Sequence, residues 1–214
     1  MSLDDPIGLL DRITIIFDTL SDDDRDVGVS ELAVRSGLPK STVSRLVSSL
    51  VSRHYLERDG TAIRLGLRLF ELGQLAETPR ALRRVALPVM AALRNSTRGN
   101  VELVLLDRGE TVHVAVARGV WNPSIAGHIG DRSDAAGSTL GRAILERATT
   151  AEVAAVTASS SVAVPRIVRV AAPLLSPSED VEAALSITVP AENADLAQLR
   201  ATVEAAAMAI CRRL

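Results

Sequence analysis

The sequence predicts an α+β protein with a helical N-terminal part followed by a sheet-containing C-terminal part. Near the N-terminus, two helical patterns are joined by a turn that contains Gly37. Further along, apolar residues alternate through "VELVLLDRGETVHVAVARG", as they do in a β-hairpin. The chain has 214 residues and 47% hydrophobic content, which is enough to bury two small cores.

Composition excludes several classes of protein. No apolar run reaches the roughly 18 residues of a membrane span, and the first residues are acidic where a signal peptide is basic. We therefore expect a soluble, cytoplasmic protein with no membrane partner. The single cysteine, Cys211, excludes an internal disulfide framework, and its apolar helical surroundings predict a buried small hydrophobe. A net charge of −2 indicates no polyanion partner for the chain as a whole.

The first two helices are predicted from apolar spacing and capping residues. In "PIGLLDRITIIFDTL" one helical stripe is formed by Leu10, Ile13, Phe17 and Leu20. In "VSELAVRSG", Ser30 is the predicted N-cap and Gly37 the left-handed terminator. The apolar core of this second helix is predicted to be Leu32, Ala33 and Val34.

The third helix, "LPKSTVSRLVSSL", has an apolar face and a polar one. The apolar residues Val43, Leu46, Val47, Leu50 and Val51 recur at spacings of three and four and predict a buried face. The opposite face consists of Ser41, Thr42, Ser44, Arg45, Ser48 and Ser49. A short helix, a turn with glycine and a second helix form a helix-turn-helix, whose second helix enters the major groove of DNA. Arg45 is the best candidate for reading a base, although a serine-rich face is also typical of a merely solvated helix.

Local charge favours nucleic acid as the partner of this region. Between Pro39 and Arg68, two acidic residues, Glu57 and Asp59, stand against the basic residues Lys40, Arg45, Arg53, Arg58, Arg64 and Arg68. The segment before Pro39 is instead predominantly acidic. The stretch "HYLERDGTAIRLG" predicts two short strands around an Asp59-Gly60 turn, which is a wing flanked by Arg58 and Arg64.

The run from Ile13 to Leu75, with "ELAVRSGLPKSTVSRLVSSLVSRHYLERDGTAIRLGLRLFELG", closely resembles the winged-helix domain of isocitrate-lyase-regulator-type (IclR) bacterial transcription factors. Two positions depart from the family pattern: His54 replaces a usual glycine, and Ala62 replaces a usual aromatic residue of the wing. The resemblance implies a winged helix-turn-helix domain over residues 1–66 and a linker helix over 67–79. It also implies a transcriptional regulator, a repressor or an activator, that acts as a homodimer or a dimer of dimers on double-stranded operator DNA. The expected DNA contacts are Lys40, Ser41, Thr42, Ser44, Arg45, Arg58 and Arg64.

The C-terminal part, residues 80–214, reads as strands with flanking helices. A linker helix from about Leu67 to Glu77 is interrupted by Pro79, and a second helix follows from about Arg80 to Arg94 with Pro88 inside it. The hairpin follows, then a helix capped by Ser138 or Thr139 with Leu140, Ile144 and Leu145 on its apolar face. Two strands, "RIVRVAAPLLS" and "VEAALSITVPA", precede a closing helix striped by Leu196, Leu199, Val203 and Ile210.

This part resembles the GAF-like α/β effector-binding domain of the same family. The matching segments are "GDRSDAAGSTLGRAILE" and "RVAAPLLSPSEDVEAALSITVPA". The resemblance implies a small organic effector, a carboxylate or an aromatic compound. A carboxylate would suit the amides at a helix N-terminus, which favour an anion. The implied effector contacts are Gly137, Ser138, Thr139, Ser186 and Thr188. The domain is apparently shortened between Glu152 and Arg166, where the family usually has about two helices forming a pocket wall.

Three hypotheses follow. The first is a ligand-responsive transcriptional regulator, and the second is a regulator whose degenerate C-terminal domain only dimerises. The third is a ligand-binding or catalytic domain whose helix-turn-helix merely packs. Catalysis is not expected, since His54, His113 and His128 lack metal-ligand spacing and no catalytic, cofactor or phosphate-loop motif occurs. His113 is expected to be packed or at a solvent edge, and Trp121 to line a pocket, an interface or the core.

Overall fold

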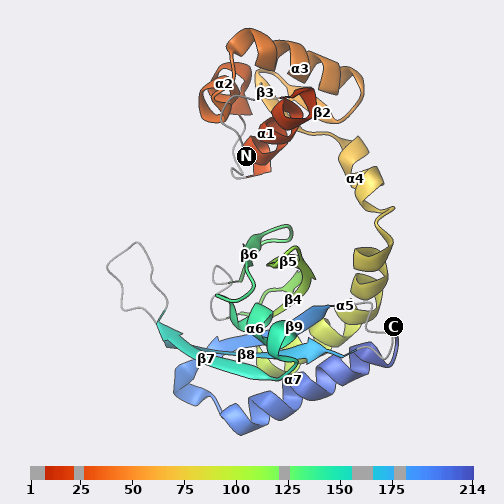
Figure 1. Ribbon diagram of the computed structural model, residues 1–214. Helices are drawn as coiled ribbons and strands as arrows, with labels where there is room; N and C mark the ends of the chain where they lie inside the picture. The colour runs from red at the N-terminus through yellow and green to blue at the C-terminus, as the bar shows by residue number, and fades with distance from the viewer. Residues whose placement is uncertain (1–7, 22–26, 121–125, 156–165, 176–181) are drawn as a thin grey trace. The chain divides into compact units, whose positions relative to one another are not determined.

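The computed structural model describes residues 8–21, 27–120, 126–155, 166–175 and 182–214, and the chain divides into two compact units, 1–76 and 77–214 (Figure 1). The first unit contains helices and a three-stranded sheet, and the second contains a six-stranded sheet with helices. The predicted α+β class is therefore confirmed. Within the described residues, no helix has the length and apolar character that crossing a membrane would require.

The first unit packs three helices on a small sheet. Its elements in chain order are α1 (Leu9–Ser21), β1 (Val27–Gly28), α2 (Val29–Ser36), α3 (Lys40–Ser52), β2 (Leu56–Asp59), β3 (Ala62–Leu65) and α4 (Leu67–Gly73). The sheet order is β1-β3-β2, with both pairs antiparallel. The core is made by fully buried side chains from the helices and the sheet, among them Ile16, Leu32, Val43, Val47 and Ile63.

The first two helices differ from the prediction at one apolar position each, whereas the buried face of α3 agrees with it. Leu10 and Val34 were predicted to be buried but are 74% and 82% exposed, and Ile16 takes the central place in α1. Helix α2 begins at Val29 after Gly28, so Ser30 lies in its first turn and is not the N-cap. Gly37 ends α2 in the left-handed conformation with φ 66°, as predicted. Helix α2 has only eight residues, and α1 carries apolar residues around much of its circumference, so spacing alone does not identify which of them are buried.

The wing is a hairpin with a two-residue loop. Asp59 pairs with Ala62, so the loop is Gly60-Thr61, one residue later than predicted, and Gly60 has φ 59°. The third strand, β1, pairs with β3 through Val27 and Gly28. A strand of two residues carries no alternation pattern, which explains why the sequence did not predict it.

Pro79 does not interrupt a helix. Helix α5 (Glu77–Thr97) already begins at Glu77, so Pro79 lies in its first turn. There the missing N–H has no intrahelical acceptor to lose, and proline is tolerated. Pro88 lies inside the same helix on its exposed side. Helix α4 ends at Gly73, earlier than the predicted linker helix.

The second unit is built on an antiparallel sheet of order β6-β5-β4-β9-β8-β7. Its strands are β4 (Asn100–Asp107), β5 (Glu110–Ala117), β6 (Arg132–Asp134), β7 (Thr150–Ala155), β8 (Arg166–Leu174) and β9 (Ala183–Pro190). The predicted hairpin is confirmed as β4 and β5, with Asp107 paired to Glu110 and the left-handed residues Arg108 and Gly109 in the loop. Strands β6 and β7 were not predicted.

Helices cover both faces of this sheet. Helices α5 and α7 (Leu196–Cys211) pack on one face, where the larger core includes Leu103, Ile187, Val170 and Val203. A 3-10 turn, η2 (Ala191–Asn193), leads from β9 toward α7. Helix α6 (Thr139–Glu146) packs on the other face through Leu140, Ala143 and Ile144, against Val104, Ala171 and Ala184. Because α6 is only eight residues long, it covers only part of its face.

Several side chains of the second unit differ from the expectation. Leu145 and Leu196 are exposed rather than buried, because each lies on the outer side of its helix. Ser138 is the N-cap of α6, since its hydroxyl accepts from the Gly141 N–H at 2.9 Å. Cys211 is only half-buried, and burial raises the pKa of its thiol. Trp121 lies outside the described residues.

Candidate functional site

The outer face of α3 is open to solvent. Lys40, Ser41, Ser44 and Arg45 are exposed, Thr42 is half-buried, and the side chains of Val43, Leu46, Val47 and Leu50 are buried beneath them. Neither Lys40 nor Arg45 makes a side-chain hydrogen bond or ion pair with another described residue. The helix therefore presents one lysine, one arginine and several small hydroxyls that the fold itself does not use.

The two arginines of the wing lie on opposite faces of the hairpin. The β2–β3 register pairs Glu57 with Arg64 and Arg58 with Ile63, and side chains alternate between faces along a strand. Arg64 forms an ion pair with Asp59, with 3.1 Å between Nη2 and Oδ2. Arg58 is exposed. The structure thus does not bring Arg58 and Arg64 onto one surface.

His54 explains why a glycine is usual at its position. Its backbone is left-handed, with φ 61°, between the end of α3 and β2. Glycine adopts this conformation without steric cost, and histidine is one of the residues that tolerate it. The departure from the family pattern is thus compatible with the wing.

The loop before α6 already uses the amides that were expected to hold an anion. The Gly137 N–H donates to Asp134 Oδ2 at 2.6 Å, and the Ser138 N–H donates to the Ala135 carbonyl at 3.3 Å. The Thr139 hydroxyl donates to Glu152, and Thr139 is fully buried. An incoming carboxylate at Gly137 would have to displace the Asp134 side chain.

Beyond the end of α6, the same sheet face carries a polar cluster, which we name the Glu102 cluster: Asn100, Glu102, His113, Arg169, Ser186 and Thr188. The strand register places Glu102 opposite Ser186, and Thr188 between Asn100 and Arg169. A bulge between Leu103 and Val104 shifts β5, so His113 lies on this face as well. The structure therefore brings the predicted Ser186 and Thr188 together, with three charged or titratable side chains beside them.

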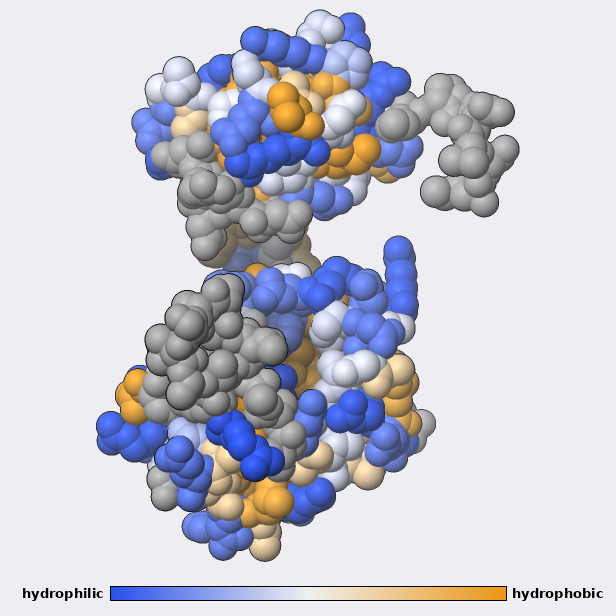
Figure 2. All heavy atoms as spheres, turned by 90° about the vertical axis from the view of Figure 1, so that its left-hand side faces the viewer, coloured by the Kyte–Doolittle hydropathy of each residue, from blue (hydrophilic) through white to orange (hydrophobic). Residues whose placement is uncertain are grey.

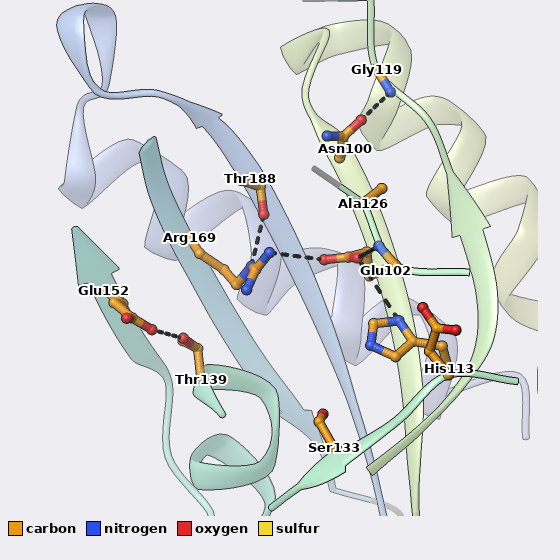
Figure 3. Close-up of polar contacts among 12 residues, drawn as sticks. Asn100, Glu102, His113, Gly119, Ala126, Ser133, Thr139, Glu152, Arg169 and Thr188 are labelled. Atoms are coloured by element: carbon orange, nitrogen blue, oxygen red, sulfur yellow. Dashed lines mark hydrogen bonds and ion pairs between the residues drawn. The ribbon is translucent and has the colours of Figure 1, made fainter. Parts of the chain in front are cut away.

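The contacts within the Glu102 cluster centre on one carboxylate (Figure 3). Glu102 is 1% exposed, and its Oε1 accepts from the Gly127 N–H at 2.7 Å. Arg169 reaches from β8 across β9, donating to Thr188 Oγ1 at 3.0 Å and approaching Glu102 Oε2 to 3.5 Å. His113 approaches from β5, with 3.8 Å between its Nδ1 and Glu102 Oε1. A buried carboxylate is thus paired with a guanidinium but not fully hydrogen-bonded.

Three buried polar atoms of the cluster have no hydrogen-bond partner within the described part of the chain: Glu102 Oε2, His113 Nδ1 and Ser186 Oγ. Buried polar atoms are nearly always hydrogen-bonded to protein, water or a ligand. By contrast, Asn100 Oδ1 has a hydrogen-bond partner, because it accepts from the Gly119 N–H at 2.6 Å. The cluster accordingly has unused donor and acceptor capacity at adjoining points on β4, β5 and β9.

The sequence did not predict Glu102 or Arg169 as site residues. Alternation along β4 correctly separates Glu102 from Val101 and Leu103, but it does not show that the face carrying Glu102 is buried as well. The available signal was that Glu102, Arg169, Ser186 and Thr188 all fall on the second face of otherwise apolar strands. No group of three or more histidine, cysteine or acidic side chains in the described ranges could hold a metal ion.

The helix-turn-helix region is similar to a known family domain. Residues 9–60 match the IclR helix-turn-helix domain. This part of the chain is therefore similar to the helix-turn-helix domain of IclR proteins. The resemblance noted in the sequence is therefore confirmed, and the matched range includes α1, α2, α3 and β2.

Curated relatives of the chain are transcriptional regulators. It is 36% identical over 118 residues to the HTH-type transcriptional regulator KipR of Bacillus subtilis (strain 168), covering 55% of this chain and 47% of that protein. It is 30% identical over 125 residues to the HTH-type transcriptional regulator KdgR of Dickeya chrysanthemi, covering 58% and 41%. The chain thus spans about half the length of the curated relatives that it matches.

Solved structures extend the likeness in fold to the whole chain. An IclR homolog from Microbacterium hydrocarbonoxydans, complexed with 4-hydroxybenzoate, superposes with a TM-score of 0.82 at 23% identity, covering 97% of this chain and 99% of that one. The IclR of Thermotoga maritima gives 0.69 at 16% identity, covering 96% and 98%. These likenesses show the fold. The second unit therefore shares its architecture with the C-terminal part of these IclR structures. The face of the molecule seen in Figure 2 is largely hydrophilic, with small apolar patches.

Proposed function

We propose that the protein is a sequence-specific DNA-binding transcriptional regulator whose C-terminal unit senses a small organic metabolite. The observation that carries the proposal is the outer face of α3 within an IclR helix-turn-helix domain. Its Lys40 and Arg45 are exposed and unused by the fold. Small hydroxyls let the helix approach base edges, and an arginine can contact guanine with two hydrogen bonds.

Roles are proposed for the individual side chains. Arg45 reads a base, and Ser41, Thr42 and Ser44 contact bases or phosphates. Lys40 neutralises a phosphate at the start of α3, where free helical amides also favour an anion. Arg58 contacts the backbone beside the wing. Arg64 contributes less, because Asp59 already neutralises it.

The test is binding of the full chain to a duplex selected from a random pool, measured by fluorescence anisotropy. Arg45→Ala is expected to weaken binding by roughly 10- to 100-fold, which corresponds to about 1–3 kcal/mol. Lys40→Ala is expected to weaken binding to all duplexes alike and to reduce the salt dependence. Arg12→Ala on α1 is the matched control and should bind as the wild type does. Unchanged binding by Arg45→Ala would overturn the proposal.

We propose that the regulator acts as a homodimer. Helix α4 and the residues on either side of it expose four large apolar side chains: Leu65, Leu67, Phe70 and Leu75. Pairing two recognition helices also supplies affinity that a single helix lacks. Sedimentation equilibrium distinguishes a dimer, a dimer of dimers and a monomer.

Ligand sensing has support from the fold and from chemistry. One solved neighbour of the same fold is complexed with 4-hydroxybenzoate. In this chain, the Glu102 cluster has three buried polar atoms without partners in the described part. We propose this cluster, which includes Ser186 and Thr188, as the polar end of the effector site. Gly137, Ser138 and Thr139 are proposed to form the rim of the site.

A second candidate is a regulator whose C-terminal unit dimerises without binding a ligand. It is favoured by the loop before α6, where Asp134 and Ala135 already accept the hydrogen bonds of Gly137 and Ser138. Thermal unfolding of the full chain in the presence of small aromatic and carboxylic compounds separates the two, because a ligand that binds the native state raises its stability. A screen with no shift favours the second candidate.

A further inference from the structure

We infer that the Glu102 cluster recognises a neutral hydrogen-bond-donating group of the effector, such as a hydroxyl or a primary amide, and disfavours a carboxylate. This inference rests on the proposed function, since it specifies what the sensing unit binds. It depends on three observations: the charge balance of the cluster, its unpartnered atoms and their common position on the sheet.

Among the described residues of the cluster, the one guanidinium is already paired and is not free for an anionic ligand. Arg169 is the guanidinium that reaches into the cluster, and it is held between Thr188 Oγ1 and Glu102 Oε2. A second arginine, Arg118, donates instead to the carbonyls of Ala126 and Gly127. A ligand carboxylate placed here would face the carboxylate of Glu102 at short range in a region of low dielectric.

The unpartnered atoms specify the hydrogen bonds that a ligand has to make. Glu102 Oε2 lies in a side chain that is 1% exposed and can only accept while the carboxylate is ionised. Beyond its ion pair with Arg169 at 3.5 Å, this oxygen can still accept a hydrogen bond from a donor. Ser186 Oγ is fully buried, can donate or accept, and also lacks a partner in the described part of the chain. His113 Nδ1 offers a third, adaptable position.

These atoms converge because of the strand register. Glu102 and Ser186 are directly opposed on β4 and β9, and His113 Nδ1 is 3.8 Å from the other oxygen of Glu102. One hydroxyl can donate to Glu102 Oε2 and accept from Ser186 Oγ. A carboxylate can only accept, so it supplies no hydrogen-bond donor to Glu102 Oε2 beyond the ion pair with Arg169 at 3.5 Å. On the far side, Glu152 is engaged by Thr139 and Arg142, so it adds no free charge to the cluster (Figure 3).

The experiment compares phenol, benzamide and benzoate, which are similar in size but differ in charge and donor capacity. Thermal unfolding of the full chain is expected to shift upward by roughly 2–4 °C with millimolar phenol or benzamide, and by less with benzoate. In Glu102→Gln the repelling charge is removed and Arg169 is released, so the order is expected to reverse in favour of benzoate. Glu110→Gln, which alters an exposed ion pair with Arg132, is the matched control and should keep the wild-type order.

A second variant protects the test if Glu102→Gln does not fold. Ser186→Ala removes a buried hydroxyl that has no partner in the described chain, so the unliganded protein should unfold at or above the wild-type midpoint, while the phenol shift falls. The inference is overturned if benzoate stabilises the wild type most, if no probe shifts a folded protein, or if Ser186→Ala leaves the phenol shift unchanged. Binding of the same samples to the selected duplex reports separately on the proposed function.

Discussion

The outer face of α3 and the Glu102 cluster are both polar surfaces, but they differ in how the protein uses them. On α3, the side chains of Lys40 and Arg45 are exposed and make no hydrogen bond or ion pair with another described residue. In the cluster, Glu102 is buried and contacts Gly127 and Arg169. The first surface is available to a large partner and contributes little to folding. The second contributes to folding and has capacity left for a small ligand. Substitutions on α3 should therefore change binding without changing stability, whereas substitution of Glu102 should change both.

The largest effect on stability is expected from Glu102→Ala. The substitution removes the acceptor of the Gly127 N–H and leaves Arg169 without its counter-charge, which should lower the free energy of unfolding by about 2–4 kcal/mol. Urea denaturation of the full chain measures it. Glu110→Ala, in an exposed pair with Arg132, should cost about 0–1 kcal/mol. Equal effects of the two substitutions would contradict the distinction between a buried and an exposed carboxylate.

An intermediate effect of opposite sign is expected from His54→Gly. His54 has φ 61°, a conformation in which glycine avoids the steric cost of a Cβ atom. The variant should therefore be more stable by about 0.5–1 kcal/mol, since this gain exceeds the added entropy of the unfolded chain. Denaturation by urea gives the value, and binding to the selected duplex serves as the check that the wing is retained. A loss of stability would show that the imidazole makes contacts that outweigh the strain.

The smallest effect on stability is expected from Arg45→Ala. Because the side chain is exposed and makes no ion pair within the described residues, the free energy of unfolding should change by less than about 0.5 kcal/mol. This near-zero result, beside the loss of DNA affinity, is what distinguishes a contact surface from a structural one. A cost above about 1 kcal/mol would place Arg45 among the residues that hold the fold together.

The same comparison explains what the sequence could and could not predict. In α3 the apolar residues from Val43 to Leu50 recur on one side and small polar residues occupy the other, so both sides of the helix were predictable. Alternation in β4 likewise separates Glu102 from Leu103, but it does not tell whether the second face of a sheet is covered. That face is covered by α6 and by the segment carrying Gly127, which are distant in sequence.

Some local details were beyond prediction for related reasons. The bulge between Leu103 and Val104, which turns His113 toward Glu102, leaves no composition signal. The hydrogen bond between Gly137 and Asp134 depends on a loop conformation that resemblance to a family does not specify. By contrast, Gly37 and the hairpin of β4 and β5 follow from backbone preferences of single residues and were predicted correctly.

The central claim is that the serine- and arginine-bearing side of α3 reads DNA sequence. The most direct measurement is selection of duplexes from a random pool by the full chain and by Arg45→Ala, followed by sequencing of the bound fraction. The wild type should enrich a motif with a guanine preference at the position that Arg45 contacts, and the variant should lose the preference at that position while keeping the others. Failure of the wild type to enrich any motif, or an identical motif from the variant, would contradict it.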